Sequence, residues 1–187
     1  MILFTNHVCD YFQNNMPDDA NYLEIGIYYG VSIANLADRY PDRKIYAVDP
    51  FIEDGNTTHD SGVDQHGPLT SQRAHAFGLA VTRPNITIFP VTSLEFSQNL
   101  TPEEIKDLRI GAVFIDGNHH YEHVVIDYRL ALALLEDRAG VIAFDDTGMT
   151  DVAQAMREFE LACGDRIVER IDLGRTAMVY KLASTML

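Results

Sequence analysis

The sequence Tyr22-Leu23-Glu24-Ile25-Gly26-Ile27-Tyr28-Tyr29-Gly30 begins with a short apolar run, reaches an acid at Glu24 and then carries two glycines. Apolar residues at helical spacing follow it. This order predicts a strand, a tight turn and the N-terminus of a helix. Glycines allow a ligand to approach the backbone, and the first turn of a helix offers N–H groups without an intrahelical partner. The stretch therefore predicts a ligand-binding loop at the end of a strand.

Strands and helices alternate along the rest of the chain. Apolar runs that end in turn residues predict strands at 21–26, 44–49, 86–91, 110–116 and 140–146. Two more strands, predicted at 166–171 and 175–181, are joined by Asp172-Leu173-Gly174. Strands that are apolar throughout and alternate with helices are typical of a parallel sheet covered on both faces. We therefore predict a doubly wound α/β fold with a mostly parallel, Rossmann-like sheet and a C-terminal antiparallel hairpin.

The length of 187 residues predicts a single domain spanning residues 1–187, because a chain of this size can bury a full core. Residues 1–20 carry apolar side chains at helical spacing, which predicts an N-terminal helix. Residues 51–68 form a long polar stretch. A connection this long within a compact domain is usually functional, so we predict an active-site loop there.

Composition excludes several classes of partner. The formal net charge is -14 and the sequence pI is near 4.7, with no Lys/Arg cluster to offset the acidity. Such a chain repels phosphate backbones and anionic membrane surfaces, so we expect neither nucleic acid nor a membrane as partner. The chain shows no signal peptide or membrane span, and Cys9 and Cys163 lie outside any C-x-x-C spacing. These features predict a cytoplasmic protein with reduced thiols.

Four of the predicted strands end in acids, namely Glu24, Asp49, Asp116 and the pair Asp145-Asp146. In doubly wound folds, ligands bind outside the carboxyl ends of the strands. A single acid in such a place can be a helix cap or a turn former. Four at the same edge are harder to assign to capping alone, and they indicate a site.

The ligand predicted for this edge is a nucleoside without phosphates. Asp49 follows the second strand, where a carboxylate can accept both hydroxyls of a ribose. Tyr28 stands where a dinucleotide site has its second glycine, and Glu24 would repel a pyrophosphate. S-adenosylmethionine meets these conditions, since it has a ribose, an ammonium and a sulfonium cation, and no phosphate.

The chain resembles class I S-adenosylmethionine-dependent methyltransferases, and within them the small-molecule O-methyltransferase group that includes macrocin O-methyltransferase. The segments that carry the resemblance are Tyr22–Ser32, Val48-Asp49-Pro50-Phe51 and Phe114-Ile115-Asp116-Gly117-Asn118-His119-His120-Tyr121-Glu122. The glycine loop alone has low specificity, and its combination with the Asp-Gly-x-His-x-Tyr stretch is much more specific. The resemblance covers about Tyr22 to Asp146 and implies a Rossmann-like methyltransferase fold.

The resemblance implies a set of cofactor-binding residues. It implies an E-x-G-x-x-x-G-x-S loop that binds the cofactor, Asp49 on the ribose, Ser93 near the adenine, and Asp116 as a further acid. The full set is Glu24, Gly26, Gly30, Ser32, Asp49, Ser93 and Asp116. The acidic residue that usually follows Asp-Gly in the family is Asn118 here, which puts one polar contact in doubt.

Members of this group hold a divalent cation at the ends of the fourth and fifth strands. The matching residues here are Asp116, Asp145 and Asp146. Three carboxylates at one place repel one another, and a hard cation such as magnesium resolves the repulsion. The alternative is that Asp145-Asp146-Thr147-Gly148 forms a turn ahead of a helix cap. Both interpretations stay open at the level of sequence.

Together with Asp116, His119 is the predicted catalytic residue, because it matches the family's histidine. A histidine can take the substrate proton near neutral pH. It could equally orient Asp116.

The predicted function is S-adenosylmethionine-dependent methylation of a hydroxyl on a sugar or secondary metabolite. The alternatives are a nicotinamide-dependent oxidoreductase and a non-catalytic cofactor-binding module. We expect a small-molecule methyl acceptor as partner, and a second copy of the chain is a further candidate.

Overall fold

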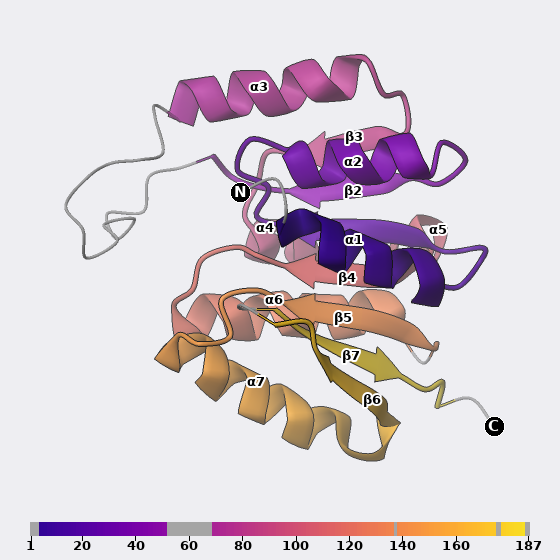
Figure 1. Cartoon of the computed structure of the whole chain (residues 1–187), viewed down its shortest axis with the longest axis vertical. Coiled ribbons are helices and arrows are strands. Elements are labelled where there is room, and N and C mark those ends of the chain that lie inside the picture. The colour runs from indigo at the N-terminus through magenta and orange to yellow at the C-terminus, as the bar shows by residue number, and fades with distance from the viewer. Residues whose placement is uncertain (1–3, 52–68, 137, 175–176, 186–187) are drawn as a thin grey trace.

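The computed structural model describes residues 4–51, 69–136, 138–174 and 177–185 of the chain. The described strands form one mixed sheet in the order β3-β2-β1-β4-β5-β7-β6 (Figure 1). Strands β1 to β5 are parallel, and β7 runs antiparallel to both β5 and β6. Their bounds are β1 Asn21–Ile25, β2 Ile45–Val48, β3 Ile86–Phe89, β4 Ile110–Ile115, β5 Gly140–Phe144, β6 Ile167–Asp172 and β7 Met178–Leu182. This sheet confirms the predicted fold class, including the C-terminal antiparallel hairpin.

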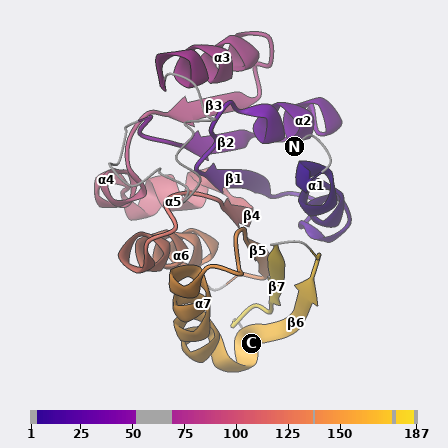
Figure 2. The same cartoon turned by 60° about the vertical axis from the view of Figure 1, so that its left-hand side comes forward.

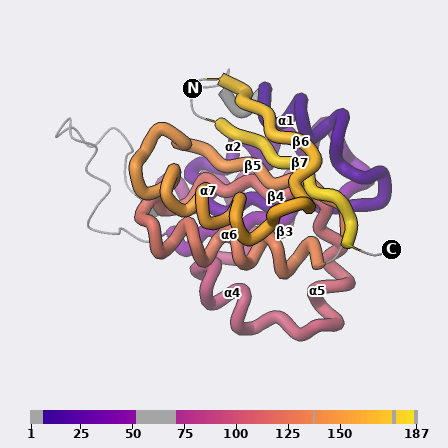
Figure 3. Tube along the Cα trace, turned by 90° about the horizontal axis from the view of Figure 1, so that it is seen from below, coloured from indigo at the N-terminus to yellow at the C-terminus, as the bar shows by residue number. Residues whose placement is uncertain are grey.

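Helices cover both faces of the sheet. The helices are α1 Phe4–Asn15, α2 Val31–Arg39, α3 Leu69–Val81, α4 Ser93–Asn99, α5 Pro102–Leu108, α6 Tyr121–Leu135 and α7 Thr150–Cys163, with a short 3-10 helix at Gly164–Arg166. Figure 2 shows α1 and α2 on one face of the sheet and α4 to α7 on the other, and the view from below separates the same two groups (Figure 3). Helix α3 lies beside α2 and β3. Among the described helices, none has both the length and the apolar character that a membrane crossing requires.

Two apolar layers fill the space between the sheet and its helices. The layer beneath α1 and α2 contains Phe12 and Ile33, whose side chains are fully buried. The layer beneath α6 and α7 contains Leu134, Phe144 and Phe159, which are also fully buried. The sheet is therefore sandwiched between helices, which explains why its parallel strands are apolar on both faces.

The strands end slightly earlier than the sequence predicts. Strand β2 ends at Val48 and β5 ends at Phe144, so Asp49 and the pair Asp145-Asp146 belong to the turns that follow. Asp side chains favour turns because they accept hydrogen bonds from nearby backbone N–H groups. Helix α7 begins at Thr150 with Met149 at its N-cap position.

The predicted loop at 51–68 lies, apart from Phe51, outside the described residues.

Candidate active site

The carboxyl ends of four parallel strands are level with one another. In the sheet register, Ile25 of β1 pairs with Val48 of β2 and with Ile115 of β4, and Ile115 pairs with Phe144 of β5. Each of these is the last residue of its strand. The sheet therefore presents the residues that follow these four strands at one edge, beside the point between β1 and β4 where the order of strands reverses.

The four residues that follow are Gly26, Asp49, Asp116 and Asp145. The backbone N–H of each still donates to a carbonyl of a neighbouring strand, at distances of 2.9, 3.2, 2.9 and 3.0 Å respectively. These bonds hold the residues in a row, so three of the predicted site carboxylates start from adjacent positions at this edge.

The turn after β1 depends on Gly26. Its φ is +82°, and a Cβ built there would lie 2.2 Å from the carbonyl oxygen of Asp116. Only glycine allows the backbones of these two strand ends to approach so closely. Gly30 closes the turn with a φ of +75° and occupies the N-cap position of α2. The sequence predicted this strand, turn and helix correctly.

The carboxylate of Asp49 holds the glycine turn. Its Oδ2 accepts hydrogen bonds from the backbone N–H groups of Ile27 and Tyr28, at 2.9 and 3.2 Å, and its Oδ1 accepts one from Phe51 at 2.7 Å. A carboxylate oxygen can accept two hydrogen bonds, so Oδ1 keeps capacity for a ligand hydroxyl. The sequence did not indicate that Asp49, directly after β2, would also accept hydrogen bonds from the backbone of the glycine turn.

Glu24 lies beneath the turn. Its side chain is buried, and its oxygens accept hydrogen bonds from Tyr22 Oη at 2.8 Å and from Ser32 Oγ. Burial raises the pKa of Glu24 to about 7, while the hydrogen bonds from Ser32 and Tyr22 act in the opposite direction. Glu24 and Ser32, two residues of the predicted cofactor-binding set, therefore contact each other directly.

Asp116 and its acidic neighbours interact strongly. Removal of the Asp116 carboxyl from water raises its pKa well above the usual value, and the charge of Asp145 is the next largest cause. Asp146, with a φ of 49°, donates its backbone N–H to Asp145 Oδ1 at 2.8 Å. The fourth and fifth strands thus bring the three predicted metal ligands into one electrostatic cluster.

The described residues nevertheless contain no group of three or more His, Cys, Asp or Glu side chains that converge closely enough to hold a metal ion. Carboxylates are the ligand type that magnesium prefers, so the donor chemistry suits such an ion while the arrangement in this structure is not closed around one.

His119 lies against Asp146. Its Nε2 is 3.2 Å from Asp146 Oδ2, but the two groups are not aligned as a hydrogen bond, and Nε2 is a buried nitrogen without a hydrogen-bond partner. Both side chains are about one-third exposed. The sequence left open whether His119 acts as a base or orients Asp116. In this geometry the carboxylate beside His119 is that of Asp146.

Asp127 contacts the predicted site residue Ser93, and sequence reasoning did not single it out. Ser93 begins α4, and its hydroxyl donates to Asp127 Oδ1 on α6. The Asp127 side chain is 2% exposed, and burial raises its pKa to about 7. An available signal was its place between Val124 and Tyr128, because these apolar residues mark the buried face of α6.

A comparison with protein families shows the class of protein to which the chain belongs. A family model described as a methyltransferase domain matches residues 23–147, which include the glycine turn and all four acidic strand ends. The chain belongs to this methyltransferase family. The methyltransferase is thus an enzyme that uses S-adenosylmethionine, as the sequence predicted, and the nicotinamide and non-catalytic alternatives are set aside.

Solved structures share the fold of the methyltransferase at low sequence identity. The O-methyltransferase NovP is 15% identical with a TM-score of 0.66, and the match covers 96% of this chain and 77% of that one. The calicheamicin methyltransferase CalS11 is 17% identical with a TM-score of 0.64, covering 95% and 78% of the two chains. A fibrillarin/Nop5p complex is 13% identical with a TM-score of 0.61, covering 96% and 80%. The search of curated proteins found no match.

Proposed function

We propose that the methyltransferase transfers the methyl group of S-adenosylmethionine to a hydroxyl of a small molecule, such as a sugar or a secondary metabolite. The observation that carries this proposal is the position of His119, whose Nε2 lies 3.2 Å from Asp146 Oδ2, at the strand ends that also bear Asp116 and Asp145. An imidazole can accept a proton near neutral pH, and a hydroxyl acceptor must lose one.

The glycine turn supports a cofactor position at the β1 end of this edge. We assign the turn between Gly26 and Gly30 to the methionine part of S-adenosylmethionine and Asp49 to the ribose, because Asp49 Oδ1 keeps acceptor capacity. Ser93 is assigned to the adenine side. Glu24 and Ser32 support the turn from beneath, where a buried carboxylate also favours a cationic cofactor.

The chemical step follows from these positions. As the oxygen–carbon bond forms, the sulfur–carbon bond breaks, and the sulfonium becomes a neutral thioether. The proton of the hydroxyl passes to the imidazole of His119, and the carboxylate of Asp146, 3.2 Å from Nε2, stabilises the resulting imidazolium. The contribution of the enzyme is to orient the two reactants and to remove the proton.

A divalent cation, magnesium in the first instance, is the proposed auxiliary group, and Asp116, Asp145 and Asp146 would hold it. Support comes from the mutual repulsion of these carboxylates, which contributes to the raised pKa of Asp116. When bound, the cation would lower the pKa of an acceptor hydroxyl.

Comparison and charge favour a small acceptor over a nucleic acid. NovP is named an O-methyltransferase and CalS11 a calicheamicin methyltransferase. Fibrillarin shares the same fold, so the fold alone does not choose the acceptor. The net charge of -14 opposes nucleic-acid binding. The cytoplasmic location, the single domain, the active-site loop at 51–68 and a homo-oligomeric assembly stay predictions.

The test combines cofactor binding with an acceptor screen. Calorimetry should show binding of S-adenosylmethionine and its demethylated product, and radiolabelled methyl transfer should occur to hydroxyl compounds rather than to amines or RNA. His119→Ala should lower kcat by about a hundredfold or more, because general base catalysis contributes at least that much, with cofactor affinity unchanged. Transfer to nitrogen, or an unchanged kcat in His119→Ala, would contradict the proposal.

The cation is tested separately. Magnesium titration should show binding to the wild type and weaker binding to Asp145→Asn, while EDTA should lower the rate of methyl transfer. Full activity in EDTA together with no measurable magnesium binding would remove the cation from the proposal and leave the base in place.

A further inference from the structure

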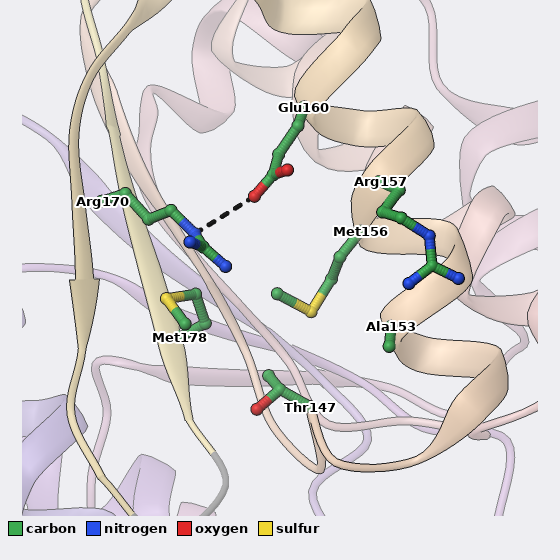
Figure 4. Close-up of a pocket in the computed structure, with 7 residues that line it drawn as sticks. All are labelled: Thr147, Ala153, Met156, Arg157, Glu160, Arg170 and Met178. Carbon is green, nitrogen blue, oxygen red and sulfur yellow. Dashed lines mark ion pairs between the residues drawn. The ribbon is translucent and has the colours of Figure 1, made fainter.

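A cavity lies beside the acidic strand ends, between α7 and the β6–β7 hairpin (Figure 4). Its volume is about 170 Å³, and it is lined by Thr147, Ala153, Met156, Arg157, Glu160, Arg170 and Met178. Sites that enclose a whole drug-sized ligand measure about 300 to 1,000 Å³. This cavity is therefore of a size to take one chemical group of a larger molecule.

One end of the cavity is lined by residues that follow or pair with the end of β5. Thr147 lines it and directly follows Asp146 in the chain. Met178, the first residue of β7, pairs in the sheet with Phe144, the last residue of β5. Thr147, at the lower end of the cavity in Figure 4, is thus the sequence neighbour of Asp146, whose Oδ2 lies 3.2 Å from His119 Nε2. A small acceptor could place a hydroxyl at His119 and another group in this cavity.

The lining carries two cations and one acid. Arg170 of β6 pairs with Glu160 of α7 at 3.1 Å between Nε and Oε1, while the side chain of Arg157, also on α7, extends away from Glu160 (Figure 4). Oε1 of Glu160 also accepts a hydrogen bond from Tyr180 Oη at 2.6 Å, so two donors hold this oxygen. None of the ion pairs among the described residues involves Arg157.

This local positive charge is unusual in a chain with a net charge of -14. The neighbouring carboxylates of Asp145 and Asp146 would repel an anion unless cations held it. Guanidinium groups bind carboxylate and phosphate oxygens through charge-assisted hydrogen bonds. The thioether side chains of Met156 and Met178 add apolar walls on the helix and strand sides (Figure 4).

We propose that the cavity between α7 and the β6–β7 hairpin binds an anionic group of the methyl acceptor, a carboxylate or a phosphate, through Arg157 and Arg170. The inference rests on the proposed hydroxyl methylation and adds a substrate class to it: the acceptor is a hydroxyl compound that carries a negative charge. Arg170 is fixed by Glu160, and Arg157 supplies the charge that Glu160 does not neutralise.

The experiment measures binding to the full chain saturated with S-adenosylhomocysteine. Glucose 6-phosphate, glucuronate and glucose serve as phosphate, carboxylate and neutral probes in calorimetric titrations. The charged sugars should bind more tightly than glucose, and the tighter of the two identifies the preferred anion. Arg157→Gln should weaken charged-probe binding by about tenfold or more, since hydrogen bonds to charged groups are worth about 1.5–3 kcal/mol.

Arg129→Gln is the matched control, because Arg129 is another exposed helical arginine and does not line the cavity. It should leave all three affinities unchanged. Equal affinity for glucose and the charged sugars, absence of binding by any probe, or equal effects of the two variants would overturn the inference. Charged-probe binding that needs Arg157 in an enzyme that methylates no hydroxyl would instead overturn the proposed function and leave the anion site in place.

Discussion

Single residues at the carboxyl edge of the sheet adopt backbone conformations that most residues avoid. Tyr28, Phe51 and Asp146 have φ values of 50°, 50° and 49°. A non-glycine residue in this region is uncommon, and such strained positions concentrate at functional sites. Each of these three residues lies in a turn that follows β1, β2 or β5. Arg109 and Glu136 have similar φ values at the C-caps of α5 and α6, so this conformation occurs at helix ends as well as in the turns of the site.

Gly26→Ala should destabilise the protein strongly. The added Cβ would lie 2.2 Å from the backbone of Asp116, which cannot move without displacing β4. Overpacking and the left-handed conformation together predict a loss of about 2–5 kcal/mol in the free energy of unfolding, measured by urea denaturation. Gly148→Ala is the control, because nothing lies within 4 Å of its Cβ position. Similar midpoints for both variants would disprove the close approach of the strand ends.

Glu24 should make the protein less stable as pH rises toward neutrality. Its pKa is about 7 in the folded protein, against an ordinary value of 4.5 for an exposed glutamate. Its contribution is fully present below pH 4.5, and it is lost as pH rises through 7, because the unfolded chain releases the proton first. One pKa unit corresponds to about 1.4 kcal/mol, so the loss amounts to roughly 3 kcal/mol.

Glu24→Gln tests this dependence. The free energy of unfolding of the variant, measured by denaturant titration from pH 4.5 to 7.5, should fall less steeply with pH than that of the wild type. Asp127 also has a pKa raised by burial, and it contributes equally to both curves. Parallel curves for the two proteins would show that Glu24 does not titrate in this range.

At the scale of elements, the two short helices α4 and α5 begin with the same N-terminal capping motif. Thr92 caps α4 and Thr101 caps α5, and in both the carboxylate of the glutamate three residues later accepts a hydrogen bond from the backbone N–H of the cap. Such capping boxes satisfy N–H groups that the first turn leaves without partners. The segment Thr101-Pro102-Glu103-Glu104 has the residue order typical of such a helix start.

Thr92→Ala and Thr101→Ala should each lower the free energy of unfolding by about 1 kcal/mol. Only Thr92→Ala should also weaken binding of S-adenosylhomocysteine, by several-fold, because Thr92 immediately precedes Ser93, which we assign to the adenine side. Thermal melts and calorimetry measure the two effects. If both variants bind the product as tightly as the wild type does, Ser93 does not belong to the cofactor site.

The whole molecule has two apolar layers separated by the sheet. Ile33 of α2 lies in one layer and Ile142 of β5 in the other. Phe144 and Phe159, by contrast, share a layer, with ring centroids 5.2 Å apart. Substitutions of contacting residues in one layer affect each other's free-energy cost directly. Substitutions in different layers can affect each other only through the strands that separate the layers.

Ile33→Val and Ile142→Val should therefore destabilise additively. Each should lower the free energy of unfolding by about 0.5–1.5 kcal/mol, and the double variant should equal the sum within about 0.5 kcal/mol. Phe144→Leu combined with Phe159→Leu should deviate from additivity by more than that. Equal coupling in the two pairs, measured by urea denaturation, would contradict the separation of the layers.

The fold could be predicted almost completely from local patterns. Apolar runs predicted the strands because a parallel sheet buries both faces, and Gly26 and Gly30 predicted the turn after β1 because that conformation suits only glycine. The acidic strand ends were visible for the same reason, since each follows an apolar run directly. Strand ends were predicted less well, because a turn residue and a last strand residue look alike in sequence.

By itself, the sequence determined the elements, their order, the acidic edge and, through motifs spanning residues 23–147, membership of a methyltransferase family. Only the tertiary structure decided which groups meet: Asp49 with the glycine turn, Glu24 with Ser32, and His119 with Asp146 rather than Asp116. It also brought Arg157 and Arg170 to one cavity. The physical reason is that periodicity and turn chemistry act over a few residues, whereas these contacts depend on strand register and helix packing.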